Sequence, residues 1–122
     1  MRVARFLLLA LAATWLAGGA LADDYEDGFT AYSRGEYQKA RAALQRAAET
    51  NNDARAQLLL GMIYANGQGV AQDFKQAASW YRKSAQQGEP KAQYNLGLLY
   101  GNGQGVAKDY ARAAEWYRKA AL

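Results

Sequence analysis

The amino-acid sequence predicts an all-α protein built as a short stack of helix-turn-helix repeats. Residues 56–86 recur 36 positions later as residues 92–122, with 19 of 31 positions identical. In each copy, small and apolar residues recur at helical spacing on both sides of a glycine-rich segment. A unit of this length forms one helical hairpin, which can bury its apolar face only against a neighbouring copy. The expected fold is therefore a solenoid, and function is expected on its stacked surface.

The first predicted helix of each copy carries a glycine in its interior. Gly61 and Gly97 directly follow Leu60 and Leu96, and a tyrosine stands three residues after each glycine. A glycine inside a helix costs roughly 1 kcal/mol relative to alanine. Its recurrence therefore predicts that a second helix packs closely against Gly61 and Gly97.

A turn and a second helix follow in each copy. The segment NGQGV brackets a polar residue with two glycines, at 66–70 and again at 102–106, and predicts a turn. Asp73 and Asp109 stand where the second helix begins, because a carboxylate there accepts backbone N–H bonds and complements the positive helix end. Gly88 is typical of a helix end and closes the first copy.

The residues shared by the two copies resemble a known repeat. The pattern A-x-x-x-L-G-x-x-Y-x-N-G-x-G-V-x-x-D-[FY]-x-x-A-x-x-W-Y-x-K-[AS]-A is similar to the Sel-one-like repeat, a relative of the tetratricopeptide repeat with a longer inter-helix turn. The resemblance implies a short right-handed α-α solenoid of about three helix-turn-helix repeats. An earlier segment, which includes Gly28 and Tyr32, resembles a tetratricopeptide unit with a short turn. The expected division is a signal peptide at 1–22, a degenerate tetratricopeptide-like repeat at 23–55, and Sel-like repeats at 56–91 and 92–122.

The first 22 residues predict an export signal. Arg2 and Arg5 precede an apolar run at 6–16, and the small residues of the Ala-Leu-Ala sequence at 20–22 suit a signal peptidase. Cleavage would start the mature chain at Asp23. The alternative is an N-terminal membrane anchor, although the apolar run is shorter than the roughly 20 residues needed to span a bilayer. Because the chain has no cysteine, it lacks the lipid-modified residue of a bacterial lipoprotein. A periplasmic or secreted location is expected, without membrane attachment after cleavage.

Charge and composition do not indicate a nucleic-acid partner. Loss of Arg2 and Arg5 with the signal leaves 13 basic residues against 11 acidic ones, a net charge of +2. The basic residues that do cluster, at 82–83 and 118–119, lie in the predicted last turns of second helices, where they complement the helix dipole. No nucleic acid is therefore expected among the partners.

The composition leaves few routes to catalysis. The sequence has no histidine and no cysteine, which removes the commonest general base, the commonest neutral metal ligand and the thiol nucleophile. Some proteins of the resembling family carry a β-lactamase label, so a β-lactamase-like hydrolase is a remote alternative. The S-x-x-K pair of such enzymes is absent, and no lysine follows Gly67 or Gly103 as a P-loop requires. We expect no enzyme, no cofactor and no metal site.

The leading hypothesis is a protein-interaction module. Stacked helix pairs curve, and the first helix of each pair lines an extended groove that suits a partner helix or an extended peptide. The expected partner is another protein, periplasmic or membrane-associated. Tyr94 is the best single anchor, since aromatic side chains with a polar tip dominate interface energetics. The resemblance implies these groove-facing residues: Arg55, Leu58, Met62 and Asn66 in one repeat, and Lys91, Tyr94, Leu98 and Asn102 in the next.

Two alternatives remain open for these residues. The apolar ones, Leu58, Met62 and Leu98, also suit an ordinary core stripe. A carbohydrate or cell-wall binder would use surface aromatic side chains, but most tryptophans and tyrosines occupy repeat-signature positions and are expected to pack internally. Only Tyr94 and Tyr25 are left over for such a role.

The C-terminal end of the stack is a second candidate surface. Repeat arrays normally finish with a helix whose outer face is polar, and none follows the last repeat here. In the preceding copy, the helix that starts near Lys91 is expected to cover the equivalent stripe. An exposed apolar end indicates self-association or partner docking, unless the aromatic residues fold back on their own repeat. The residues in question are Ala113, Trp116, Tyr117 and Ala120.

Overall fold

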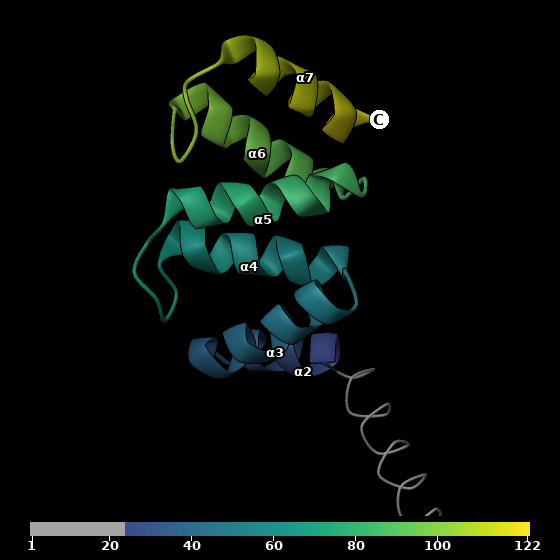
Figure 1. Cartoon of the computed structure of the whole chain (residues 1–122), viewed down its shortest axis with the longest axis vertical. Helices are drawn as coiled ribbons and strands as arrows, with labels where there is room; N and C mark the ends of the chain where they lie inside the picture. Colours follow the sequence, from purple (N-terminus) through teal and green to yellow (C-terminus); the bar gives the residue numbers. More distant parts are fainter. Residues whose placement is uncertain (1–23) are drawn as a thin grey trace, which may run out of the picture.

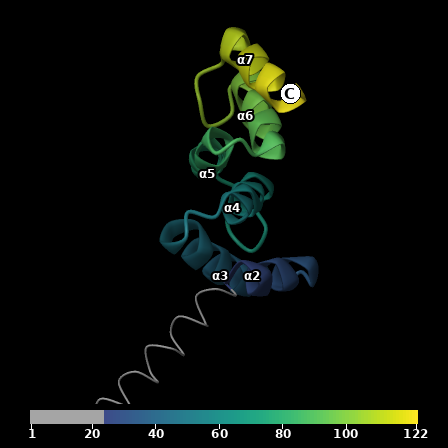
Figure 2. The same ribbon diagram turned by 90° about the vertical axis from the view of Figure 1, so that its right-hand side faces the viewer.

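The computed structural model describes residues 24–122, so the expectations for the first 22 residues and for cleavage before Asp23 lie outside it. Within residues 24–122, six helices stack in chain order, from the N-terminal pair to the C-terminal helix α7 (Figures 1 and 2). Consecutive helices form three hairpins, α2–α3, α4–α5 and α6–α7, and this part of the chain contains no strand. The predicted all-α repeat solenoid is confirmed. The helices are α2 (Asp24–Ser33), α3 (Tyr37–Thr50), α4 (Ala54–Asn66), α5 (Phe74–Gln86), α6 (Pro90–Asn102) and α7 (Tyr110–Ala121).

The predicted turns and caps are present in both long hairpins. Gly67 and Gly103 end α4 and α6 in the left-handed conformation, at φ values of 63° and 65°. The Asp73 carboxylate accepts a hydrogen bond from the Gln76 N–H at 3.1 Å and begins α5. Asp109 begins α7 in the same way. These caps satisfy backbone donors that a helix start leaves without partners.

The interior glycines mark the closest approach within each hairpin. A β-carbon at Gly61 would overlap the Tyr81 ring. One at Gly97 would lie 2.7 Å from Cε1 of Tyr117. The predicted close packing of a second helix against both glycines is confirmed.

The core forms two clusters, one at each junction between hairpins. The first joins α3 and α4 and includes the fully buried Leu44, Leu60 and Ile63. The second joins α5 and α6 and includes Tyr81 and Leu96. Each hairpin is therefore stabilised by its neighbours, as expected for a solenoid.

The stripe of α5 divides between these clusters, which corrects one expectation. Ala77 and Tyr81 lie in the cluster that α6 covers. Trp80 instead belongs to the first cluster, and the Ser84 hydroxyl donates to the Ala54 carbonyl at 2.7 Å. The expectation that the helix starting near Lys91 covers the stripe of Ala77, Trp80, Tyr81 and Ser84 is wrong for Trp80 and Ser84, because these two face the preceding helix α4.

Two buried glutamines, which the sequence analysis did not single out, tie the hairpins together. The Gln57 amide donates to the Ala48 carbonyl at 3.4 Å, and the Gln93 amide donates to the Ala85 carbonyl at 3.1 Å. Each carbonyl lies near the end of the preceding second helix, where intrahelical partners run out. Each glutamine therefore fixes the orientation of its own hairpin relative to the preceding hairpin.

Candidate protein-binding groove

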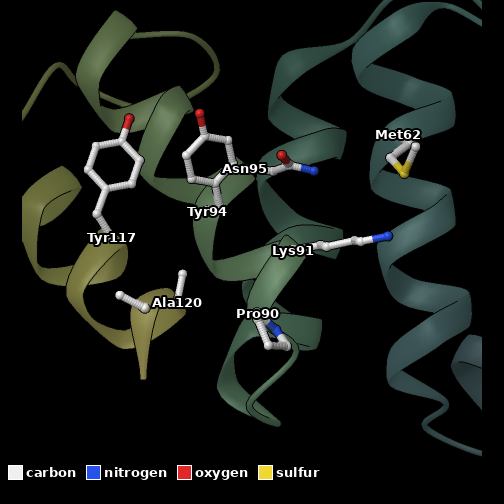
Figure 3. A pocket seen from close by; sticks show the side chains of 8 residues that line it. Met62, Pro90, Lys91, Tyr94, Asn95, Tyr117 and Ala120 are labelled. Carbon is white, nitrogen blue, oxygen red and sulfur yellow. The ribbon is translucent and has the colours of Figure 1, made fainter.

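Two connected hollows lie along the first helices α4 and α6. The smaller, of about 340 Å³, includes Met62, Asn66, Leu98 and Asn102. The larger, of about 710 Å³, is formed by α4, α6 and α7 (Figure 3). Met62 and Asn95 line both hollows, so the two are continuous. We call the smaller one the groove and the larger one the end hollow. The end hollow is lined by Met62, Pro90, Lys91, Tyr94, Asn95, Tyr117, Ala120 and Ala121.

Six of the eight predicted groove residues line one of these hollows, and two do not. Leu58 is only 9% exposed and packs in the cluster between α5 and α6, so its assignment to the groove is wrong. Arg55 is exposed, but its guanidinium lies 3.8 Å from the centre of the Tyr25 ring and pairs with the Asp53 carboxylate at 2.8 Å. It contributes to the junction with α2, outside both hollows.

The end hollow is lined by residues from both predicted surfaces, the groove along the first helices and the C-terminal face of α7. Tyr94 from α6 and Tyr117 from α7 have ring centres 5.5 Å apart, and Ala120 lies on the same side of α7 (Figure 3). The other two predicted members of the C-terminal face are placed differently. Ala113 is 3% exposed against α6, so it belongs to the core of its hairpin and not to a surface. Trp116 is half-buried outside the hollow, with the Lys119 ammonium 4.5 Å from its ring centre.

Comparison with known proteins agrees with this architecture. The family model of the Sel1 repeat matches residues 54–89 and 90–122. The chain belongs to the Sel1-repeat family. Proteins of this family are generally helical scaffolds for protein–protein interaction and are generally non-catalytic. A comparison with curated protein sequences gave no match.

Three solved structures are similar to this Sel1-repeat chain. A Sel1 repeat protein from Oxalobacter formigenes is 37% identical, with a TM-score of 0.71 over 80% of this chain and 40% of its own. The protein c5321 of uropathogenic Escherichia coli, a protective antigen with an SLR fold, is 37% identical, with a TM-score of 0.76 over 93% of this chain and 25% of its own. The cysteine-rich protein B of Helicobacter pylori shares the fold at 24% identity, with a TM-score of 0.72 over 88% of this chain and 85% of its own. The chain thus spans less than half the length of the first two.

Asn95 is a groove residue that the sequence analysis missed. It occupies the position of Leu59 in the preceding Sel1 repeat and lies at the point where the groove meets the end hollow. Its side chain shares a hydrogen bond with the Tyr81 phenol. Burial of that phenol raises the pKa of Tyr81 to about 12, and the hydrogen bond lowers it only in part. The sequence did contain a signal for this residue, because asparagine stands at a position where the preceding repeat has leucine.

The chemistry of the groove suits a polypeptide. Amide side chains at Asn66, Asn95 and Asn102 can both donate and accept, as a peptide backbone requires. Met62 and Leu98 add apolar surface between them, and Leu98 is exposed. This combination of apolar lining and a few polar groups is typical of peptide and small-molecule sites.

Other site types have no support in residues 24–122. The acidic side chains there do not gather in a group of three or more that could hold a metal ion. None of the helices in that range has the length and apolar character needed to cross a membrane. Its exposed large aromatic residues are Phe29, Tyr94 and Tyr110, and they lie on three different helices.

Proposed function

We propose that the chain is a non-enzymatic adaptor or scaffold that binds a peptide or helix of another protein in the groove. The observation that carries the proposal is the continuous surface along α4 and α6, in which asparagine amides alternate with apolar side chains. Several packing residues, such as Leu60/Leu96 and Gly61/Gly97, are identical in the two Sel1 repeats, whereas Met62 is replaced by Leu98 in the groove and only the asparagine at 66 and 102 is the same there. Such differences are expected where a particular partner shapes the exposed side.

Affinity purification with a matched pair of variants tests this proposal. Leu98→Glu places a charge in the groove at an exposed position, and Ala107→Glu places the same charge on the exposed turn after α6. We expect wild type and Ala107→Glu to retain the same partner protein and Leu98→Glu to lose it at least about tenfold, as for an interface hot spot. Equal recovery by all three proteins would refute the groove as the binding site.

Export is the second part of the proposed function. It is supported by the paired arginines, the apolar run and the Ala-Leu-Ala sequence at 20–22. Intact-mass measurement of the protein from its native cells should give a chain that starts at Asp23, recovered from the periplasm or the medium. Recovery of the full 122-residue chain from a membrane fraction would contradict export by cleavage and favour the anchor.

The carbohydrate alternative receives no such support. Trp80, Tyr81 and Tyr100 are buried in the repeat cores, which leaves few rings for a sugar-stacking strip. Co-sedimentation of the protein with purified cell wall is the direct test. We expect the protein to stay in the supernatant, and saturable sedimentation would reopen the alternative.

A further inference from the structure

The hydroxyl group of Tyr100 is the point where two arginines from different helices meet. Nη2 of Arg82 on α5 donates to this oxygen at 3.0 Å, and Nη1 of Arg112 on α7 donates to it at 3.4 Å. The tyrosine belongs to α6 and is only 5% exposed. Burial of the phenol by itself raises its pKa, but the two arginines hold the pKa of Tyr100 below the ordinary value of 10.0. Two cations therefore lie close together around one neutral acceptor, and we call Arg82 and Arg112 the arginine pair.

The charge of the arginine pair is only partly compensated within residues 24–122. Arg112 pairs with the Asp109 carboxylate at 3.5 Å. Glu115 also acts on Arg112, but it is itself paired with Lys119 at 3.7 Å. No ion pair joins Arg82 to a carboxylate in this range. Because each guanidinium carries several N–H donors, the arginine pair keeps both positive charge and donors for a further oxygen ligand.

Around the tyrosine of the middle repeat, glutamines take the places of both arginines. Gln76 stands 36 positions before Arg112, and Tyr64 stands at the equivalent tyrosine position. Gln45 takes the place of Arg82, since each directly follows the residue that packs on the interior glycine of its hairpin. Tyr64 nevertheless packs against both core clusters. The fold therefore does not need arginines to pack a tyrosine in this position.

The outer side of such a junction is open even where another hairpin follows. Gln76 is exposed although the hairpin α6–α7 comes after it. Its counterpart Arg112 has a side chain that is 64% exposed, and Arg82 is half-buried. Access to the arginine pair is therefore set by the register of α5, α6 and α7, and it does not depend on what lies beyond residue 122.

The arginine pair lies on a different side of the stack from the groove. Leu98 lines the groove, and Tyr100 follows it by two residues, which is roughly 200° around α6. Neither arginine lines the groove or the end hollow. A ligand of the arginine pair would therefore leave the groove accessible.

We propose that the arginine pair binds the carboxylate of an aspartate or glutamate side chain of a partner protein. A carboxylate offers one oxygen to each guanidinium in charge-assisted hydrogen bonds. Its single negative charge matches the positive charge that Asp109 leaves uncompensated. A phosphate group would bring nearly twice that charge close to the Asp109 carboxylate. The proposal shares with the proposed function the premise of a protein partner, but it does not rest on the groove.

Two small probes test the site directly. N-acetylglutamate α-amide carries one side-chain carboxylate, and N-acetylglutamine α-amide is its neutral control. Nuclear magnetic resonance titrations of the isotope-labelled protein at constant ionic strength follow the backbone amides near Tyr100 and the Nε–H groups of both arginines. The glutamate probe should give saturable shifts at these signals, and the glutamine probe should give none.

Substitutions that reproduce the middle repeat locate the site. Arg82→Gln combined with Arg112→Gln should weaken binding of the glutamate probe at least about tenfold. Arg112→Gln alone should weaken it at least about threefold, and this single variant decides the question if the double variant does not fold. Arg118→Gln, at an exposed position on α7, should change binding less than about twofold. Leu98→Glu in the groove should also leave binding within that range, which separates this site from the proposed function.

Four results would overturn the proposal. Absence of saturable binding of the glutamate probe, or equal binding of the glutamine probe, would remove the carboxylate site. Binding that the two glutamine substitutions leave unchanged would place the carboxylate elsewhere. Tighter binding of N-acetylphosphoserine α-amide than of the glutamate probe would reassign the ligand to a phosphate group. Loss of binding with Leu98→Glu would mean that the arginine pair and the groove are not separate sites.

Discussion

The two ends of the stack present opposite surfaces. Gly28 of α2 packs on Leu44 as Gly97 of α6 packs on Tyr117, so α2 is the first helix of an equivalent hairpin. Yet α2 turns the exposed Asp27 and Thr30 outward, whereas α7 leaves Tyr117, Ala120 and Ala121 in an apolar hollow. The exposed residues of α2 named here are polar, whereas the hollow beside α7 is mainly apolar. The comparison shows that the hairpins share their internal packing, whereas the exposure of a hairpin's outer face depends on whether another helix packs on it.

The largest effect expected from this comparison is at the position before the packing glycine. Asp27, Leu60 and Leu96 occupy this position in the three hairpins, and both leucines are fully buried. Leu96→Asp should cost at least about 4 kcal/mol, because it buries an unpaired charge between α5 and α6. In a domain of this size that loss abolishes cooperative folding. Thermal unfolding followed by circular dichroism measures it.

The reverse change is the control for the exposed polar side of α2. Asp27→Leu should alter the free energy of unfolding by no more than about 0.5 kcal/mol, since the side chain is exposed. It should instead lower solubility by adding an apolar residue to the N-terminal face. A loss of stability comparable to that of Leu96→Asp would show that α2 is not a solvent-facing cap.

The two tryptophans offer the next contrast. Trp80 lies in the first core cluster at 8% exposure, and its counterpart Trp116 is half-buried beneath Lys119. Trp80→Ala should cost about 3–5 kcal/mol as a large-to-small core change. Trp116→Ala should cost about half as much, because only part of its surface leaves water. Urea unfolding curves with comparable slopes provide both values, and equal losses would mean that α7 is covered in solution.

Much of this fold could be predicted because it depends on local signals that repeat. The period of 36 residues, the glycine pair in each turn and the caps at Asp73 and Asp109 each dictate a local conformation. The close approach of a second helix at Gly61 could also be predicted, because a glycine that destabilises a helix is expected where no larger side chain fits. These features do not depend on which neighbour a repeat has.

The candidate site was harder to predict because exposure depends on neighbours. Leu58 and Tyr94 occupy the same register position, and only the presence of α6 above Leu58 buries it. Asn95 was missed because its neighbours in the sequence are apolar, and its hydrogen bond to Tyr81 crosses between hairpins. Ala113 and Trp116 were placed on a surface because helical spacing cannot tell which side of a stripe faces its own hairpin.

The interior glycines test whether the middle repeat, which α6 covers, is more rigid than the last repeat. Alanine at Gly61 would overlap the ring of Tyr81, which α6 holds in place. We expect Gly61→Ala to cost about 1–3 kcal/mol, even after the gain in helix propensity. At Gly97 the closest obstruction is the ring of the half-exposed Tyr117, which can turn outward, and the Ala113 carbonyl oxygen at 3.2 Å needs only a small shift, so Gly97→Ala should cost less than Gly61→Ala. Melting temperatures of the two variants give the order, and a larger loss at Gly97 would show that Tyr117 is fixed in solution.

The smallest effect concerns the buried phenol under α6. Burial raises the pKa of Tyr81 to about 12 in the folded protein, against an ordinary value of 10.0. The contribution of this phenol to stability is therefore complete below pH 10 and is lost as the pH rises toward 12, because the unfolded chain ionises first. At pH 11 the loss should be about 1 kcal/mol. Denaturant unfolding of wild type and Tyr81→Phe at pH 9 and pH 11 isolates this term, because Tyr81→Phe should lose about 1 kcal/mol less between the two pH values. An identical pH dependence for both proteins would mean that α6 does not seal Tyr81 from solvent. The middle repeat would then be no better covered than the last repeat at this position.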